Sequence, residues 1–215
     1  MTTLEAVKER PILFSGKMVR AILDDEKTQT RRVIDRMTGF KTKGFDRSDT
    51  NGYDWHFRCQ RGMWQDMDHA EVISRCPYGQ VGERLWVRES HAFVDATCGL
   101  VTNPNVTSKV SPFGSKHEHM ACVYRQEQFR MDFNGPWKPS IHMPRWASRI
   151  TLEITGVRIE RLTDISPADC VAEGIRRNDP EGSPRLGFAK LWESINGEGS
   201  WDADPWLWVV EFARI

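Results

Sequence analysis

The sequence lacks any long apolar run. No stretch of about eighteen consecutive apolar residues, the length that crosses a bilayer as a helix, occurs among its 215 residues, and no charged-then-apolar leader opens it. We therefore expect an intracellular protein without a membrane partner. With 39% hydrophobic and 28% charged residues, the chain has the composition of a globular protein long enough for one well-buried domain.

Paired cysteines are also missing. The five cysteines form an odd set without a C-x-x-C pair, which argues against a disulfide framework and favours a reducing cytosol.

Two groups of residues contain possible zinc ligands: His56, Cys59, His69 and Cys76; and His117, His119 and Cys122. Neither group follows the tight spacing of a structural zinc site, and we predict no metal. Glycine-rich phosphate loops, G-x-S-x-G elbows and H-E-x-x-H helices are absent as well.

The chain has no excess charge of either sign. Thirty basic residues balance thirty acidic ones, which argues against a protein that coats long nucleic acid through its phosphates. Basic residues nevertheless outnumber acidic ones in residues 1–50 and in residues 137–162. Any nucleic-acid partner is therefore expected to be small or bound locally.

Several segments carry clear secondary-structure signals. Helical spacing of apolar residues predicts a helix over residues 16–25, which should fray or turn at three consecutive acids, and residues 28–34 read as a strand. Further strands are expected within residues 82–90, 120–126, 149–162, with a bend at Gly156, and 205–215; helices are expected at residues 166–174 and 186–196. The second of these helices should place Phe188, Leu191, Trp192 and Ile195 on one face.

Two segments read differently. Residues 35–75 are polar, rich in glycine and aspartate, and without sustained periodicity, while residues 92–117 read as a loop. Because strands outnumber helices and no regular βαβ alternation is present, we predict an α+β fold built on a small mixed barrel with flanking short helices.

Residues 84–88 place Arg84, Trp86 and Arg88 on one face of a strand. Such a face can hold a planar anion, or the tryptophan can simply cover a barrel end between two solvated arginines. The segment "HMPRWASR" adds Arg145 beside another tryptophan. Both interpretations remain open from the sequence.

Two short stretches are candidates for chemistry. "DDEKTQTRRV", residues 24–33, places Lys27, Thr30, Arg31 and Arg32 directly behind three acids, which is otherwise typical of a solvated charge run. In "DISPADCVAEGI", Glu173 ends a helix that begins at Ser166 and Pro167, so its carboxylate stands at the negative end of the helix dipole. The negative charge of Glu173 is electrostatically unfavourable in that position, which suggests that the residue serves another purpose.

Four stretches together resemble the ASCH domain of the PUA-like superfamily, in a form common among tailed-phage and prophage genes: "RPILFSGKMVRAILDDEKTQTRRV", "GERLWVRES", "DISPADCVAEGI" and "WVVEFARI". The resemblance covers about half of the chain and implies a single PUA-like domain over residues 1–215. Residues 35–75 and 91–135 would be insertions relative to the smallest members. Asp25 and Glu26 replace the glycine that usually precedes the lysine of this motif.

The smallest bacterial members of that family are amidohydrolases that convert N(4)-acetylcytidine to cytidine and acetate. The resemblance places their lysine, threonine and glutamate at Lys27, Thr30 and Glu173, and implies a small nucleoside or nucleotide substrate, no cofactor and a place in the host cytoplasm. We expect substrate contacts from Arg31, Arg32, Arg84, Trp86, Arg88 and Arg145. The alternative is a module that binds RNA or modified nucleotides, or a ribonuclease, using the same basic residues. A phage assembly factor has no positive feature in the sequence.

Overall fold

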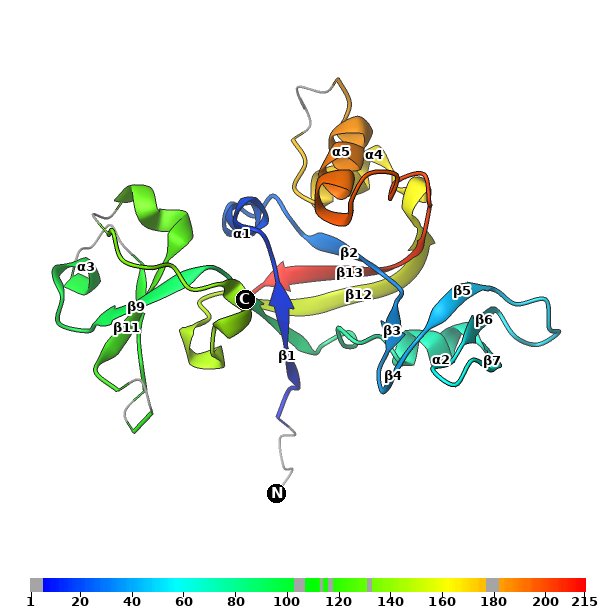
Figure 1. The fold of residues 1–215 in the computed structure, drawn as a ribbon, viewed down its shortest axis with the longest axis horizontal. Coiled ribbons are helices and arrows are strands. Elements are labelled where there is room, and N and C mark those ends of the chain that lie inside the picture. The colour runs from blue at the N-terminus through cyan, green and yellow to red at the C-terminus, as the bar shows by residue number, and fades with distance from the viewer. Residues whose placement is uncertain (1–5, 103–106, 113, 116–117, 131–132, 177–181) are drawn as a thin grey trace. The chain divides into compact units, whose positions relative to one another are not determined.

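The structure is a computed structural model that describes residues 6–102, 107–112, 114–115, 118–130, 133–176 and 182–215 (Figure 1). It is a mixed α+β protein, with most of its regular structure in strands of several sheets and few helices. The chain divides into two compact units. One consists of Met1–Asp25, Arg84–Leu152 and Arg214–Ile215, and the other consists of Glu26–Glu83 and Glu153–Ala213.

The first unit begins with a parallel strand pair. Strand β1 (Glu9–Leu13) pairs with β8 (Arg84–Arg88), and helix α1 (Gly16–Leu23) follows β1. The helix ends directly before the acids, and Asp25 adopts a left-handed backbone conformation with φ 57°. The turn predicted at the acids is thus confirmed, since carboxylates at a helix C-terminus oppose the dipole.

A second sheet in this unit has the order β10-β11-β9, with all pairs antiparallel. Its strands are β9 (His91–Asp95), β10 (Ser108–Val110) and β11 (Met120–Tyr124), and a short helix α3 (Gly99–Thr102) follows β9. The loop predicted at residues 92–117 is therefore wrong in part. Small alternating residues such as Ala92 and Val94 pack with Ala121 and Val123 in a core that weak apolar patterning did not reveal.

Three short 3-10 helices complete the first unit: η1 (Arg125–Arg130), η2 (Ser140–His142) and η3 (Arg145–Ala147). The last two lie in a segment that contains Pro136, Pro139 and Pro144, and proline disfavours longer helices. Tyr124, Met143 and Ala147 form a buried cluster between η3 and β11, and the Tyr124 hydroxyl donates a hydrogen bond of 2.8 Å to the Ala147 carbonyl.

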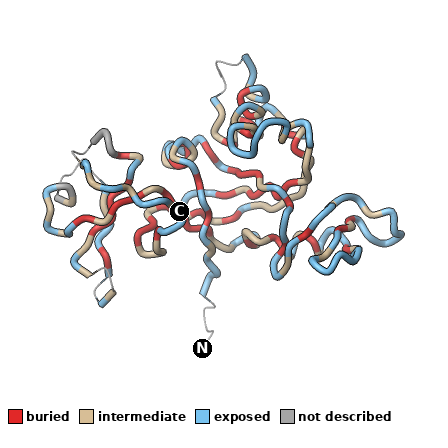
Figure 2. The backbone as a smooth tube through the Cα atoms, viewed as in Figure 1, coloured by how far each residue is buried: buried red, intermediate tan, exposed pale blue. Residues whose placement is uncertain are grey.

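In the second unit, strand β13 (Trp206–Arg214) lies between β12 (Thr151–Arg161) and β2 (Gln29–Val33). The β13–β2 pair is antiparallel, with Val210 opposite Thr30. Residues 151–161 form one continuous strand through Gly156, as predicted. A Cβ atom there would lie 2.6 Å from Glu211 Oε2, so a larger residue at this position would require the Glu211 side chain to move. Buried residues follow these strands (Figure 2).

The polar segment 35–75 contains regular structure, which its sequence did not indicate. It forms a two-stranded hairpin, a three-stranded antiparallel sheet and a helix: β3 (Arg36–Met37), β4 (Phe40–Lys41), β5 (Lys43–Arg47), β6 (Trp55–Arg58), β7 (Trp64–Met67) and α2 (His69–Ser74). Trp55 and Phe57, two residues apart on β6, are fully buried. Their large apolar surfaces stabilise a short strand in which the surrounding residues are mostly polar.

Two helices complete the second unit. Helix α4 (Pro167–Ala172) begins at Ser166, whose side chain accepts a hydrogen bond from the Asp169 amide in a capping box, and it ends at Glu173 followed by Gly174 with φ 93°. These boundaries match the prediction. Helix α5 (Pro184–Asn196) packs beside α4.

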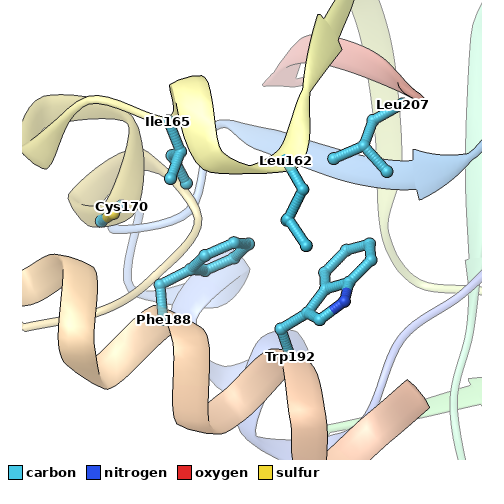
Figure 3. Close-up of a cluster of buried hydrophobic side chains, with 6 residues drawn as sticks. All are labelled: Leu162, Ile165, Cys170, Phe188, Trp192 and Leu207. Atoms are coloured by element: carbon cyan, nitrogen blue, oxygen red, sulfur yellow. The ribbon is translucent and has the colours of Figure 1, made fainter. Parts of the chain in front are cut away.

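The helices share a core (Figure 3). Its six buried members are Leu162, Ile165, Cys170, Phe188, Trp192 and Leu207. Ile195, which helical spacing places on the same face of α5, lies outside this core and is 55% exposed.

None of the sheets formed by the described residues closes on itself, so the PUA-like barrel stays a prediction. The single domain with two insertions also stays a prediction.

All five cysteines lie in described segments and are free thiols. Among the described helices, none combines the length and apolar character needed to cross a bilayer.

Candidate functional site

Lys27 and Glu173 meet in the second unit through both backbone and side chains. The two residues form an isolated antiparallel bridge at the start of β2 and the end of α4. Next to the bridge, the Thr28 amide donates to the Ala172 carbonyl at 2.8 Å, and the Thr28 carbonyl accepts from the Phe212 amide at 2.8 Å. The turn that carries Lys27 is thus held between α4 and β13.

The two side chains form a short buried ion pair. Lys27 Nζ lies 2.6 Å from Glu173 Oε2, and it also donates to the Glu173 carbonyl at 2.9 Å and to the Gln29 carbonyl at 2.7 Å. The Lys27 side chain is 0% exposed and that of Glu173 is 3% exposed. Three acceptors match the three N–H bonds of an ammonium group, so this geometry favours the ion pair.

The pKa of Lys27 is nevertheless lowered from its ordinary value. Burial is the largest cause, because it disfavours the charged form. The charge and hydrogen bond of Glu173 oppose this effect, while the charges of Arg32 and Arg31 add to it. The amine is therefore easier to deprotonate than a lysine in water.

Arg31 reaches the same carboxylate from β2. Its Nη1 donates to Glu173 Oε1 at 3.3 Å, and its Nη2 donates to Glu160 Oε2 at 2.9 Å and lies 3.6 Å from Asp169 Oδ2. The Arg31 side chain is 0% exposed. Each oxygen of Glu173 therefore faces a different cation.

Gln29 and Asp169 connect β2 to the first turn of α4. Gln29 Nε2 donates to the Asp169 carbonyl at 2.9 Å and to its Oδ1 at 3.0 Å. Burial works to raise the pKa of Asp169, but hydrogen bonds from Ser166 and Gln29 and the charge of Arg31 outweigh it and lower that pKa to about 2. Asp169 is therefore an anion at neutral pH.

An outer layer of charges continues from these residues. Arg158 on β12 contacts Glu160, Asp169 and Glu211, the Asp169 contact being 3.0 Å from Nη2 to Oδ1. These four side chains are between 24% and 45% exposed, so they form the solvent side of the cluster. The cluster thus has a buried Lys27–Glu173–Arg31 centre and a half-buried rim.

The other predicted residues of β2 have different surroundings. Thr30 is buried and stands opposite Val210. Strand alternation directs its side chain to the face opposite that of Gln29 and Arg31. Arg32 stands opposite Trp208, and its charge acts on the Lys27 amine.

The remaining predicted residues, Arg84, Trp86, Arg88 and Arg145, belong to the first unit. Trp86 is only 7% exposed, and the guanidinium carbons of Arg88 and Arg145 lie 4.6 and 5.9 Å from its ring centre. Arg145 also forms a two-point ion pair with Glu9, at 2.6 and 2.9 Å. Here the tryptophan is covered by arginines and offers little open face for stacking a base.

Possible metal ligands do not gather in the described part of the chain, where no three His, Cys, Asp or Glu side chains are placed to hold an ion. His69 instead accepts a hydrogen bond at its Nδ1 from Trp55 Nε1, at 3.1 Å. His117, which the sequence grouped with His119 and Cys122, lies outside the described residues.

Sequence reasoning missed the part that Gln29, Arg158, Glu160, Asp169 and Glu211 play in this cluster. A signal was present, since Gln29 and Arg31, and likewise Arg158 and Glu160, are separated by two positions and so share a strand face.

No protein-family model, curated protein or solved structure gives a significant match to the chain.

Proposed function

We propose that the protein hydrolyses the acyl amide of a modified nucleoside, with N(4)-acetylcytidine converted to cytidine and acetate. The observation that supports this most strongly is the buried contact of 2.6 Å between Lys27 Nζ and Glu173 Oε2. The resemblance of the surrounding motifs to the ASCH domain supports the substrate class and the PUA-like barrel. A buried pair of this kind handles protons well, because a low dielectric brings the ionised and neutral forms closer in free energy.

The reaction begins with a proton transfer inside the pair. Glu173 takes a proton from Lys27, which leaves a neutral amine and a neutral carboxylic acid. The lowered pKa of Lys27 makes this transfer less unfavourable than it would be in water. General base and general acid are thereby created together, 2.6 Å apart.

Hydrolysis follows from these two groups. The Lys27 amine takes a proton from a water molecule, and the resulting hydroxide attacks the acetyl carbonyl. Glu173 gives its proton to the departing amino nitrogen as the amide bond breaks, and the acetyl group leaves as acetic acid, which ionises to acetate. Thr30 takes no direct part, because strand alternation directs its side chain, like that of Arg32, to the face of β2 opposite Gln29 and Arg31.

Access to the pair requires movement, because both side chains are almost completely covered. The rim side chains Arg158, Glu160, Asp169 and Glu211 are the partly exposed members of the cluster, and they would have to move for substrate to enter there. Such side-chain rearrangements on ligand binding are common.

The proposal is tested by incubating the purified protein with N(4)-acetylcytidine and following the ultraviolet shift as cytidine forms. Lys27→Met and Glu173→Gln should each abolish turnover. Arg75→Gln is the matched control, because Arg75 pairs with Glu71 on the surface of the same unit at 2.8 Å. No turnover by the unaltered protein, or normal turnover by both site variants, would contradict the proposal.

A further inference from the structure

The two oxygens of the Glu173 carboxylate are held by two different cations. Oε2 accepts from Lys27 Nζ at 2.6 Å, and Oε1 accepts from Arg31 Nη1 at 3.3 Å. A carboxylate held at one oxygen can rotate about its terminal torsion, which has a broad energy minimum. Contact at both oxygens restricts that rotation and fixes the plane of the carboxylate relative to the lysine.

Arg31 is suited to this task because it is itself fixed. Nη2 donates to Glu160 Oε2 at 2.9 Å and lies 3.6 Å from Asp169 Oδ2, while Nη1 is directed to Glu173. Its Nε–H is buried and has no hydrogen-bond partner among the described protein atoms. A planar guanidinium held on one side by β12 and α4 therefore presents its remaining edge to Glu173 in a set orientation.

We infer that Arg31 is a positioning residue for the proposed reaction: it fixes the Glu173 carboxylate so that Oε2 faces the Lys27 amine. This inference rests on the proposed function for its catalytic consequence, but its geometric content concerns only the described side chains. Arg31 acts through Glu173, and it is distinct from Lys27, Thr30 and Glu173, which the family resemblance identifies.

Removal of Arg31 changes both geometry and charge around Lys27. The charged groups that face this lysine are Glu173 from the end of α4 and Arg31 and Arg32 from β2; beyond them lie Asp169 of α4, Arg158 and Glu160 of β12, and Glu211 of β13. Loss of one cation raises the pKa of Lys27, so the coupled pair should release its proton at higher pH.

Kinetics of two variants test the inference. Arg31→Met should lower kcat on N(4)-acetylcytidine by roughly 10- to 100-fold, the scale of a misplaced catalytic group, with KM changed less than about twofold. Its descending pH limb, where the pair loses the proton that Glu173 must donate, should move to higher pH. Arg31→Lys keeps the charge but cannot bridge Glu160 and Glu173, so kcat should fall while the limb stays in place.

A purely structural role for Arg31 predicts a different result. Partial unfolding lowers the active fraction and hence the apparent kcat, but it leaves the pH limb of Arg31→Met where it is in the unaltered protein. That outcome would overturn the inference, as would an Arg31→Lys variant with unchanged kcat. Arg75→Gln serves as the control for removing an arginine from an ion pair elsewhere in the unit.

A double-mutant cycle measured on the free energy of unfolding tests the contact between Arg31 and Glu173 without any substrate. If Arg31 holds Glu173, the Arg31→Lys/Glu173→Gln double variant loses less stability than the sum of the two single variants. Additive losses would refute the positioning contact. Should the unaltered protein fail to turn over N(4)-acetylcytidine, the proposed function fails, while this cycle still decides whether Arg31 fixes Glu173.

Discussion

Lys27 Nζ and Glu173 Oε2 lie 2.6 Å apart although the two residues are separated by 146 positions in the chain. The acids before Lys27 end helix α1, and the capping residues of α4 place Glu173 at the last position of that helix. Two local signals, each weak in isolation, thus determine where the partners of the pair stand. The contact makes several quantitative expectations possible.

Removal of either partner should destabilise the protein, but unequally. Glu173→Gln leaves the Lys27 ammonium buried without its counter-ion, and we expect a loss of about 3–5 kcal/mol in the free energy of unfolding. Lys27→Met should lose less, because Glu173 keeps the Arg31 guanidinium at 3.3 Å. Urea unfolding at neutral pH measures both values, and equal losses, or a larger loss for Lys27→Met, would contradict this expectation.

Acid should weaken the second unit through Asp169. Its pKa is about 2 in the folded protein, below the ordinary aspartate pKa of 3.8, so the unfolded state binds more protons between these values. Stability from this carboxylate is therefore complete above about pH 4 and is lost as the pH falls towards 2. Asp169→Asn should lack that part of the pH dependence. Thermal unfolding between pH 2 and 6 measures it, and parallel curves for the two proteins would exclude the effect.

The cap of α4 should matter for activity beyond its contribution to stability. Ser166→Ala removes the acceptor for the Asp169 amide and should cost about 1 kcal/mol. Because α4 carries Glu173 at its end, turnover of N(4)-acetylcytidine should fall as well.

Ser183→Ala provides a matched comparison, since Ser183 caps α5 by accepting from the Leu186 amide at 3.2 Å and is likewise followed by proline. It should cost a similar amount of stability with turnover unchanged. An equal loss of turnover in both variants would show that the effect is general destabilisation.

Trp86 should contribute to stability rather than to nucleic-acid binding. It is 7% exposed, and Trp86→Ala should lower the free energy of unfolding by about 3–5 kcal/mol, as for other buried aromatic residues.

Arg145→Gln breaks the exposed pair with Glu9 and should lower the free energy of unfolding by less than about 1 kcal/mol. Retention of short single-stranded RNA at low salt is expected to be the same for Arg145→Gln and the unaltered protein; weaker retention would instead favour an RNA-binding role.

The sequence predicted the elements that have strong local signals. The boundaries of α4 follow from Ser166, Pro167 and Gly174, and β12 and β13 follow from their apolar runs. It did not predict β5 to β7, where only Trp55 and Phe57 are completely buried within a polar segment, because tertiary packing of a few aromatic residues outweighs local propensity.

The candidate site was predictable only in part, for a similar reason. Lys27 and Glu173 stand in recognisable local contexts, but the contacts of Arg31 with Glu160 and Asp169 depend on how β2, β12 and α4 come together. Spacing within one segment carries no information on such contacts. The contacts of Trp86 with Arg88 and Arg145 likewise join residues that the strand pattern alone does not bring together.

The hydrogen bond from the Phe212 amide to the Thr28 carbonyl makes assembly of the site a late event. A ribosome delivers Lys27 early, but the strand that anchors its turn emerges only after residues 206–214 have been synthesised. Until then the turn that carries Lys27 lacks one of its two backbone anchors. We therefore expect the contact between Lys27 and Glu173 to become fixed only when this strand has joined the sheet.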